Sequence, residues 1–137
     1  MNEPLPILLV EDDDALAELV QLALREISVT IEHAQTGAAA LAALERGAPA
    51  PRLVLLDLDL PDMRGLQVLE RQRERDVQRV IPIVVLSSSE EPEDIARAAE
   101  LGANSYVVKP PTFERFREHV ALVVSYWTLL HRMPETP

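Results

Sequence analysis

The stretch LVLLDLDLPDMRG, residues 53–65, runs four apolar residues into Asp57, adds a second acid at Asp59, and then breaks at Pro61 and Gly65. A short apolar run bounded by turn residues predicts a buried strand, and the carboxylate after it predicts where that strand reaches water. For an isolated acid, a solvated strand end is a sufficient explanation. Whether Asp57 has a chemical role therefore depends on the residues that surround it in the fold.

Four further apolar runs accompany this one, and segments of helical period separate them. The predicted strands are residues 7–10, 29–33, 53–56, 81–86 and 105–108. The predicted helices follow them over 16–27, 37–44, 66–75, from 92 to the stop at Gly102, and over 113–127 with Thr112 as the cap. Strands alternating with helices predict right-handed crossovers and a parallel sheet covered on both faces. We therefore expect an α/β fold, a doubly wound sheet of five strands with five helices.

Composition points to one domain and limits the classes of partner. The 137 residues suffice for a single core, and no repeat or low-complexity segment is present. Thirteen Lys and Arg residues against 23 Asp and Glu residues give a net charge of −10, which disfavours nucleic acid and anionic membranes. The sequence has no Cys, no signal peptide and no window near the roughly 18 apolar residues of a membrane span. We expect a soluble, cytoplasmic protein.

Polar side chains follow several of the predicted strands. Glu11 and Asp12 come after the first, Asp57 after the third, Ser87 after the fourth, and Lys109 after the fifth. If the strand order is 2-1-3-4-5, the three acids converge at the carboxyl edge of the sheet, where such folds place their ligands. Three close carboxylates need a cation, and their oxygen ligands suit Mg²⁺. Ser87 and Lys109 can then hold a phosphoryl group on Asp57.

Each of these residues also has a simpler explanation. Asp13 and Asp14 precede the first amphipathic helix, where capping and first-turn roles account for them. Ser87 alone could be a turn hydroxyl, and Lys109 alone a solvated loop charge. The joint placement of these side chains, one after each appropriate strand, favours the chemical interpretation.

The motifs ILLVEDD, LVLLDLDLPDMRG, PIVVLSS and GANSYVVKP, over about residues 7–126, resemble the receiver domain of two-component response regulators. The resemblance implies a flavodoxin-like fold with the strand order 2-1-3-4-5. It also implies that Asp57 accepts a phosphoryl group from a sensor histidine kinase, and that Ser87 and Lys109 contact that group. Asp12, Asp57 and the backbone carbonyl of Asp59 would bind Mg²⁺, with Glu11 supporting the metal. Tyr106 would move with Ser87 when the domain switches.

The C-terminal region predicts the kind of receiver. Only 137 − 109 = 28 residues follow Lys109, so we expect one receiver domain over 1–137, with a core of about 7–126, an extension of about 127–137 and no output domain. The segments KPPTFERF and SYWTLLHRMPETP resemble the single-domain regulators that partner phytochrome-type histidine kinases. Output would then be a docking surface or a step in a phosphorelay, and the protein would not be an enzyme beyond its own phosphotransfer and slow autodephosphorylation.

Two other interpretations fit parts of the same pattern. An Asp-x-Asp motif after a strand also opens haloacid dehalogenase-type phosphatases, in which Asp57 would be the nucleophile, Asp59 the general acid, and Ser87 and Lys109 the phosphate ligands. Those enzymes place their acidic metal pair after the Lys, whereas here the acidic pair precedes Asp57. A module that has lost phosphorylation is disfavoured because every residue type of an acceptor site is present.

Two positions depart from the common receiver pattern. Ser88 stands where many receivers have Ala or Gly, and Pro111 follows Lys109-Pro110 where an apolar residue is common. We expect Asp59, Ser88 and Ser89 to tune the lifetime of the phosphoryl group, because they lie beside the path by which a hydrolytic water would reach it.

The end of the last predicted helix suggests an interface. Phe113, Phe116, Val120 and Val123 can cover the sheet, which would leave an exposed apolar strip further along. We expect a homodimer through the fourth helix, fifth strand and fifth helix, with Tyr126, Trp127 and Leu130 in the contact. The alternative is that this tail folds back onto its own domain.

Overall fold

The computed structural model describes residues 3–47, 49–76 and 81–132. In these ranges five parallel strands form one sheet in the order β2-β1-β3-β4-β5, which confirms the predicted fold. The strands are β1 Leu5–Val10, β2 Val29–Ala34, β3 Leu53–Leu56, β4 Ile83–Ser87 and β5 Ser105–Val108. Because all strands run the same way, their carboxyl ends share one edge of the sheet.

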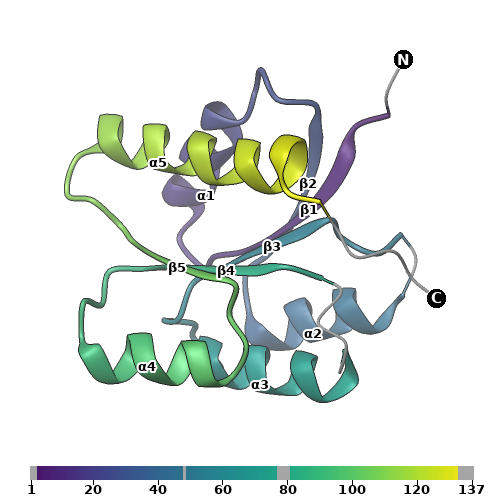
Figure 1. Cartoon of the computed structure of the whole chain (residues 1–137), viewed down its shortest axis with the longest axis vertical. Coiled ribbons are helices and arrows are strands. Elements are labelled where there is room, and N and C mark those ends of the chain that lie inside the picture. Colours follow the sequence, from purple (N-terminus) through teal and green to yellow (C-terminus); the bar gives the residue numbers. More distant parts are fainter. Residues whose placement is uncertain (1–2, 48, 77–80, 133–137) are drawn as a thin grey trace.

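Helices cover both faces of the sheet. They are α1 Asp14–Ala23, α2 Gly37–Glu45, α3 Gly65–Arg75, α4 Pro92–Glu100 and α5 Phe113–Ser125, which continues into the π-helical turn η1 Tyr126–Leu130. Helices α1 and α5 lie on one face, and α2, α3 and α4 lie on the other (Figure 1). No helix of the described ranges is long and apolar enough to cross a membrane.

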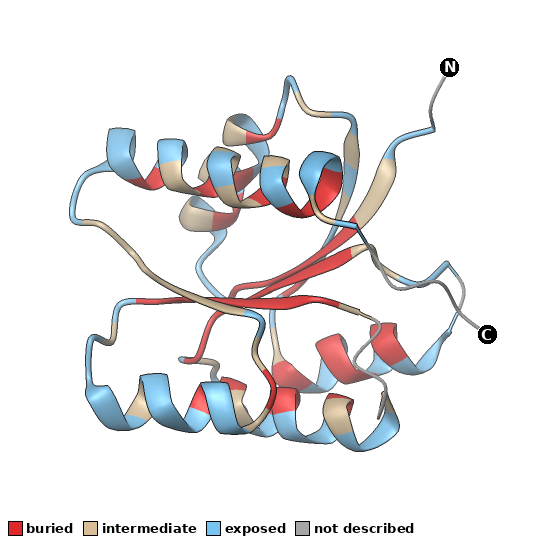
Figure 2. Cartoon of the chain, viewed as in Figure 1, coloured by how far each residue is buried: buried red, intermediate tan, exposed pale blue. Residues whose placement is uncertain are grey.

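The core is divided by the sheet into two layers (Figure 2). All four residues of β3 are buried; Val54 and Leu56 contribute to the layer under α2, α3 and α4, and Leu53 and Leu55 to the layer under α1 and α5. A strand buried on both faces is therefore apolar at every position, as the sequence predicted.

Helix ends follow local sequence signals. The Asp13 carboxylate accepts the N–H of Ala15 at 2.9 Å and of Leu16 at 3.3 Å, which confirms its capping role. Thr112 caps α5, and Gly102 ends the fourth helix with a φ of +95°, a conformation that glycine adopts without strain.

Two of the element boundaries that differ from the prediction have clear local causes. Helix α1 ends at Ala23, and Ile27 instead forms a turn, its N–H donating to the Leu24 carbonyl at 3.0 Å, while still packing on the core. Strand β4 begins at Ile83 because the N–H of Ile81 donates to Asp76 at 2.9 Å and Pro82 has no N–H to offer the ladder.

The C-terminal helix also differs from expectation. Phe113 does not cover the sheet, since it is 69% exposed; Phe116, Val120 and Val124 form the buried row. Trp127 is only 7% exposed and packs in the core layer under α5, so it is not part of an exposed strip. Trp127 lies three residues after Val124 and seven after Val120, so helical spacing places it on the same buried face, and the π-turn then closes with the His131 N–H donating to the Tyr126 carbonyl at 2.7 Å.

Candidate functional site

The candidate site lies at the carboxyl edge of the sheet, where backbone hydrogen bonds extend past the strand ends. The N–H of Asp57 donates to the Val10 carbonyl at 3.0 Å, and the N–H of Lys109 donates to the Ser87 carbonyl at 2.8 Å. These bonds fix the two residues that follow β3 and β5. The sheet thus brings together side chains that are far apart in sequence.

Three carboxylates meet at this edge. Glu11, Asp12 and Asp57 have oxygens that all lie within 4.8 Å of one another. Glu11 is 4% exposed and Asp57 is 5% exposed, whereas Asp12 faces solvent. The Lys109 Nζ lies 2.9 Å from a Glu11 oxygen and 3.6 Å from an Asp57 oxygen. One ammonium group therefore forms ion pairs with two buried carboxylates.

Burial changes the protonation of this cluster. It raises the pKa of the Asp57 carboxyl to about 7, although the charge of Lys109 opposes the shift and the charge of Glu11 adds to it. Burial lowers the pKa of the Lys109 ammonium, but its contacts with Glu11 and Asp57 outweigh burial and leave that pKa raised. Lys109 therefore stays positively charged at neutral pH, and the Asp57 carboxyl has a pKa near neutral pH.

The donor set fits a hard divalent cation. Three carboxylates face one ammonium group, so the site carries an excess of negative charge when Asp57 is ionised. Its ligands are oxygens only, and exposed Asp12 leaves one side open to water, both of which suit Mg²⁺. Asp59, predicted to contribute its carbonyl, contacts Asp57 through its own N–H, which lies 3.3 Å from the Asp57 carboxylate.

The loop after Asp57 is held tightly. The Gly65 N–H donates to the Leu58 carbonyl at 2.8 Å, and a Cβ at Gly65 would lie 2.3 Å from the Asp57 carbonyl oxygen. Only glycine allows α3 to begin so close to the end of β3. Asp62 accepts the N–H groups of Ala38 at 2.9 Å and Gly37 at 2.8 Å, and these bonds lower the pKa of its carboxyl.

The loop after β4 is the other wall of the site. Ser87 is fully buried, and its hydroxyl oxygen accepts the N–H of Ser89 at 3.1 Å. The Tyr106 hydroxyl donates to the Ser89 carbonyl at 2.9 Å, which ties β5 to this loop. Ser88 is exposed and lines a cavity of about 250 Å³ with Lys109 and the residues that begin α5.

The structure therefore groups Glu11, Asp12, Asp57 and Lys109, with Ser87 on the adjacent strand. Tyr126, Trp127 and Leu130 belong to η1 at the C-terminal end of α5. The candidate site lies instead near the end at which α5 begins (Figure 1).

Sequence reasoning missed two acids that organise the surrounding loops. Asp62 joins the loop after β3 to the start of α2, 25 residues earlier in the chain. Asp94 accepts a hydrogen bond from the Ser89 hydroxyl at 2.5 Å. Neither stands out in the sequence, because Asp62 lies in a turn and Asp94 in the first turn of a helix, where acids are common.

Comparison with known proteins places this geometry in a family. The chain matches the response regulator receiver domain over residues 7–121. It is 39% identical over 139 residues to the probable methanogenesis regulatory protein FilR2 of Methanothrix harundinacea, covering 97% of this chain and 90% of that protein. It is 36% identical over 135 residues to the response regulator Rcp1 of Synechocystis sp., covering 92% and 90%.

Solved structures agree with the sequence comparison. The phosphorylated cyanobacterial phytochrome response regulator RcpA superposes with a TM-score of 0.90 at 30% identity, covering 96% of this chain and 99% of that one. The Mn²⁺-bound form of response regulator Rcp1 gives a TM-score of 0.86 at 33% identity, covering 96% and 100%.

These findings do not support the phosphatase alternative. The family match over residues 7–121 includes the acidic pair before Asp57, the acceptor strand and the Lys109 region, and the superposition on RcpA covers 96% of this chain. This chain belongs to the response regulator receiver domain family.

Proposed function

We propose that this chain is a phosphoacceptor response regulator in which Asp57 receives a phosphoryl group from the phosphohistidine of a sensor histidine kinase. The observation that carries the proposal is the grouping of buried Asp57 with Glu11, Asp12 and Lys109 at the edge of a receiver fold. A carboxylate beside a positive charge is a nucleophile suited to accept a phosphoryl group.

The transfer requires little covalent chemistry from the protein. An Asp57 carboxylate oxygen forms a bond to phosphorus, the bond between phosphorus and the histidine nitrogen breaks, and the imidazole leaves. Lys109 neutralises charge on the phosphoryl oxygens, and the Ser87 hydroxyl donates to one of them. Glu11, Asp12 and Asp57, with the Asp59 carbonyl, would hold Mg²⁺, which supplies further neutralisation of the phosphoryl charge when bound.

The added group would shift the conformation of the domain. A phosphoryl group brings about −1.5 to −2 charge, which attracts the Ser87 hydroxyl and favours a rearranged β4–α4 loop with Tyr106 following. Asp59, Ser88 and Ser89 would tune how long the phosphoryl group persists. The protein would act as a switch with slow autodephosphorylation, and not as an enzyme with a separate substrate.

Similarity to RcpA and Rcp1 supports a phytochrome-type kinase as the phosphoryl donor. FilR2 is named as a methanogenesis regulator, so the identity of the kinase needs a direct test. Phosphorylated kinases of the phytochrome class and of other classes are mixed with the chain and phosphotransfer is measured. Preferential transfer from a phytochrome kinase supports this pathway. Onward transfer to a second histidine would instead indicate a phosphorelay intermediate.

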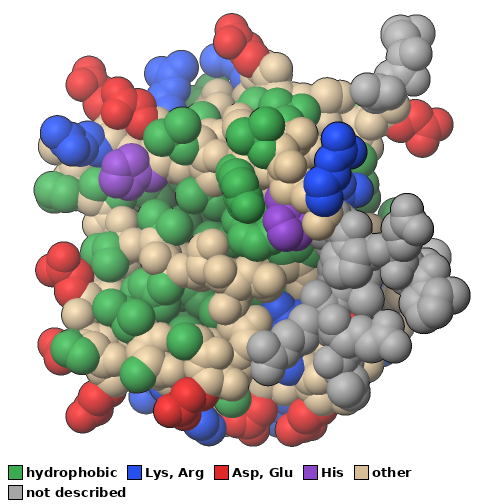
Figure 3. Space-filling model, viewed as in Figure 1, with side chains coloured by type: hydrophobic (Ala, Val, Ile, Leu, Met, Phe, Trp, Pro, Cys, Tyr) green, Lys and Arg blue, Asp and Glu red, His purple; other side chains and the backbone are tan. Residues whose placement is uncertain are grey.

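We also propose a homodimer through α4, β5 and α5. Its support is the group of exposed apolar side chains near the end of α5, which includes Tyr126 at 47% exposure and Leu130 at 70%. Hydrophobic side chains are gathered over α5 and across the middle of the face shown in Figure 3. Buried Trp127 would support this surface from beneath.

Labelling with acetyl phosphate tests the central proposal. With Mg²⁺ present, the wild type should gain one phosphoryl group, and Asp57→Asn should gain none. Asp62→Asn is the matched control, since it removes an acid from the same loop that does not belong to the carboxylate cluster. Undiminished labelling of Asp57→Asn at another acid would show that Asp57 is not the acceptor.

A further inference from the structure

Ser89 is the centre of a hydrogen-bond network that joins β4 to α4. Its N–H donates to the Ser87 hydroxyl oxygen at 3.1 Å, and its carbonyl accepts the Tyr106 hydroxyl at 2.9 Å. Its own hydroxyl donates to Asp94 at 2.5 Å and accepts the N–H of Glu91 at 3.2 Å. The loop that carries Ser87 is therefore fixed to α4 mainly through this one residue.

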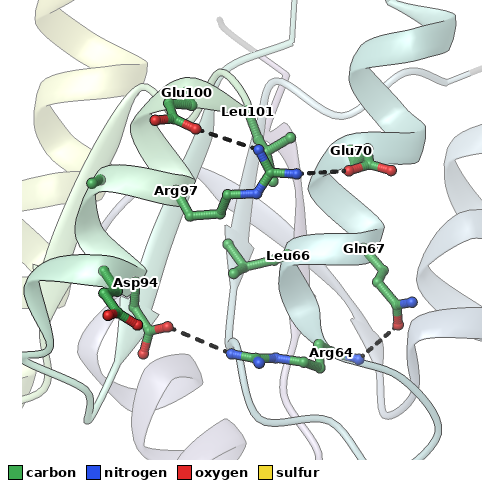
Figure 4. Close-up of a pocket in the computed structure, with 10 residues that line it drawn as sticks. Arg64, Leu66, Gln67, Glu70, Asp94, Arg97, Glu100 and Leu101 are labelled. Carbon is green, nitrogen blue, oxygen red and sulfur yellow. Dashed lines mark hydrogen bonds and ion pairs between the residues drawn. The ribbon is translucent and has the colours of Figure 1, made fainter.

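Asp94 extends the network to a second loop. One of its oxygens binds Ser89, and the other lies 3.5 Å from the guanidinium of Arg64, the residue before α3 (Figure 4). Both residues line a groove of about 640 Å³ between α3 and α4. Asp94 therefore sits between the loop after the acceptor strand and the loop after β4.

The two contacts of Asp94 differ in strength. A hydroxyl-to-carboxylate distance of 2.5 Å is in the range of strong charge-assisted hydrogen bonds, and the Asp94 side chain is only 24% exposed. The Arg64 side chain is 69% exposed, and a long ion pair in solvent contributes little. The bond to Ser89 is thus the contact that can restrain the loop.

We propose that Asp94 is a positioning residue for the phosphorylation switch. Its carboxylate holds Ser89, and through Ser89 the Ser87 hydroxyl, in the arrangement that the structure shows. This restrains the hydroxyl from moving toward a phosphoryl group on Asp57. The inference rests on the proposed phosphoacceptor function, and adds to it a residue outside the acceptor site that sets how readily the switch responds.

The physical basis is a difference in bonding between two loop arrangements. A phosphoryl group adds strong acceptor oxygens, to which the Ser87 O–H would donate. Moving that hydroxyl displaces the Ser89 N–H that donates to it, and Ser89 cannot follow without lengthening its bond to Asp94. A bond that is stronger in one arrangement opposes any ligand that favours the other. Weakening the bond must therefore tighten binding of a phosphoryl group or its analogue.

The test compares two variants of the same helical turn, each of which removes one negative charge. Asp94→Asn weakens the bond to Ser89, whereas Glu93→Gln removes the same charge from the first turn of α4; among the described residues, no hydrogen bond or ion pair links Glu93 to Ser89. Beryllofluoride, a phosphoryl analogue, is titrated into each isotope-labelled full chain with saturating Mg²⁺. Binding is followed by the NMR signals of the Ser87 and Ser89 amides.

Asp94→Asn should bind beryllofluoride about three- to tenfold more tightly than the wild type, because part of the strength of one charge-assisted hydrogen bond is released. Glu93→Gln should stay within about twofold of the wild type. Before any beryllofluoride is added, the Ser89 amide signal should shift in Asp94→Asn and not in Glu93→Gln. Mg²⁺ affinity should be the same in all three proteins, which separates a change in the switch from general damage to the site.

A second variant keeps the test decisive if Asp94→Asn folds poorly. Ser89→Ala removes the same bond from its other end and should also tighten beryllofluoride binding. In the double variant the two effects should be less than additive, as expected for partners in one contact.

The outcomes separate the two proposals. Unchanged or weaker beryllofluoride binding in Asp94→Asn and Ser89→Ala, with normal binding by the wild type, overturns the role of Asp94 and leaves the phosphoacceptor function intact. If the wild type neither binds beryllofluoride nor accepts a phosphoryl group from acetyl phosphate, the proposed function fails and the inference fails with it.

Discussion

The carboxyl group of Asp57 makes the stability of the chain depend on pH. Burial raises its pKa to about 7 from the ordinary 3.8. Between these values the folded chain binds more protons than the unfolded chain, so the free energy of unfolding should fall as pH rises through this window. Without divalent metal, the wild type should lose on the order of 1–3 kcal/mol from about pH 4 to above pH 7.

Asp57→Asn should remove this loss, because the amide stays neutral on both sides of the window. Urea unfolding at pH 5 and pH 8 in the presence of a chelator provides the measurement. The variant should be more stable than the wild type at pH 8 and closer to it at pH 5. Equal pH dependence in the two proteins would mean that Asp57 is not the group that titrates.

Two glycines near the site should respond differently to the same change. A Cβ on Gly65 would meet backbone atoms, the Asp57 carbonyl oxygen at 2.3 Å and the Leu58 Cα at 2.6 Å. The three atoms nearest to a Cβ on Gly37 would all belong to the flexible side chain of Met63. Gly65→Ala should therefore lower the free energy of unfolding by about 2–4 kcal/mol, and Gly37→Ala by less than about half of that. Denaturant unfolding of both variants distinguishes them, and equal losses would contradict the close approach at Gly65.

At this scale the sequence was informative wherever a side chain directly followed a strand. Glu11, Asp57 and Lys109 could be placed together because the strand order alone brings their positions to one edge. The contacts of Asp62 and Asp94 could not be predicted, since they depend on how loops close over helix ends and no periodic pattern encodes such closure.

Among the helices, α3 is attached to the sheet by an arginine whose side chain is largely covered by protein. The Arg73 side chain, 8% exposed, donates to the Gly102 carbonyl at 2.8 and 3.0 Å, to the Ile81 carbonyl at 2.9 Å and to Asn104 at 2.7 Å. Asn104 in turn accepts the N–H of Ile83 at 2.8 Å. One guanidinium thus joins the end of α3 to the start of β4 and to the segment between α4 and β5.

Arg73→Met should keep the apolar stem and leave these carbonyls without their donor. We expect the free energy of unfolding to fall by about 2–4 kcal/mol, because unsatisfied buried acceptors are costly. Arg71→Met on the same helix is the control, since Arg71 is exposed and should change stability by less than about 0.5 kcal/mol. Similar urea midpoints for the two variants would show that the Arg73 contacts do not stabilise the fold.

The predicted element boundaries were wrong where a local hydrogen bond outweighed the apolar pattern. The stripe that reaches Ile27 is real, since Ile27 packs on the core, but a turn and not a helix carries it there. The predicted last helix ran as a regular helix to residue 127 and missed the π-turn that follows Ser125, because a single extra residue per turn leaves no periodic signal in so short a segment.

The burial of Trp127 changes how the whole-molecule prediction of a dimer must be tested. Trp127 packs under α5 and against the His131 ring, with ring centroids 4.3 Å apart. Trp127→Ala should therefore remove about 3–5 kcal/mol of stability whether or not a dimer forms. A loss of association in that variant would say nothing about the interface, so exposed residues must carry the test.

Leu130→Ser changes a side chain that is 70% exposed at the end of α5, within the proposed dimer face. Leu22→Ser is its control, because Leu22 is also exposed but lies on α1, which is outside that face. Light scattering across a dilution series should give a dimer mass for the wild type and for Leu22→Ser at tens of micromolar. Leu130→Ser should raise the dissociation constant of the dimer by at least roughly tenfold, since the interface loses two copies of an apolar anchor that each contribute on the order of 1–2 kcal/mol. A wild type that remains monomeric at tens of micromolar, with and without acetyl phosphate, would remove the dimer and leave the exposed leucines to a different partner.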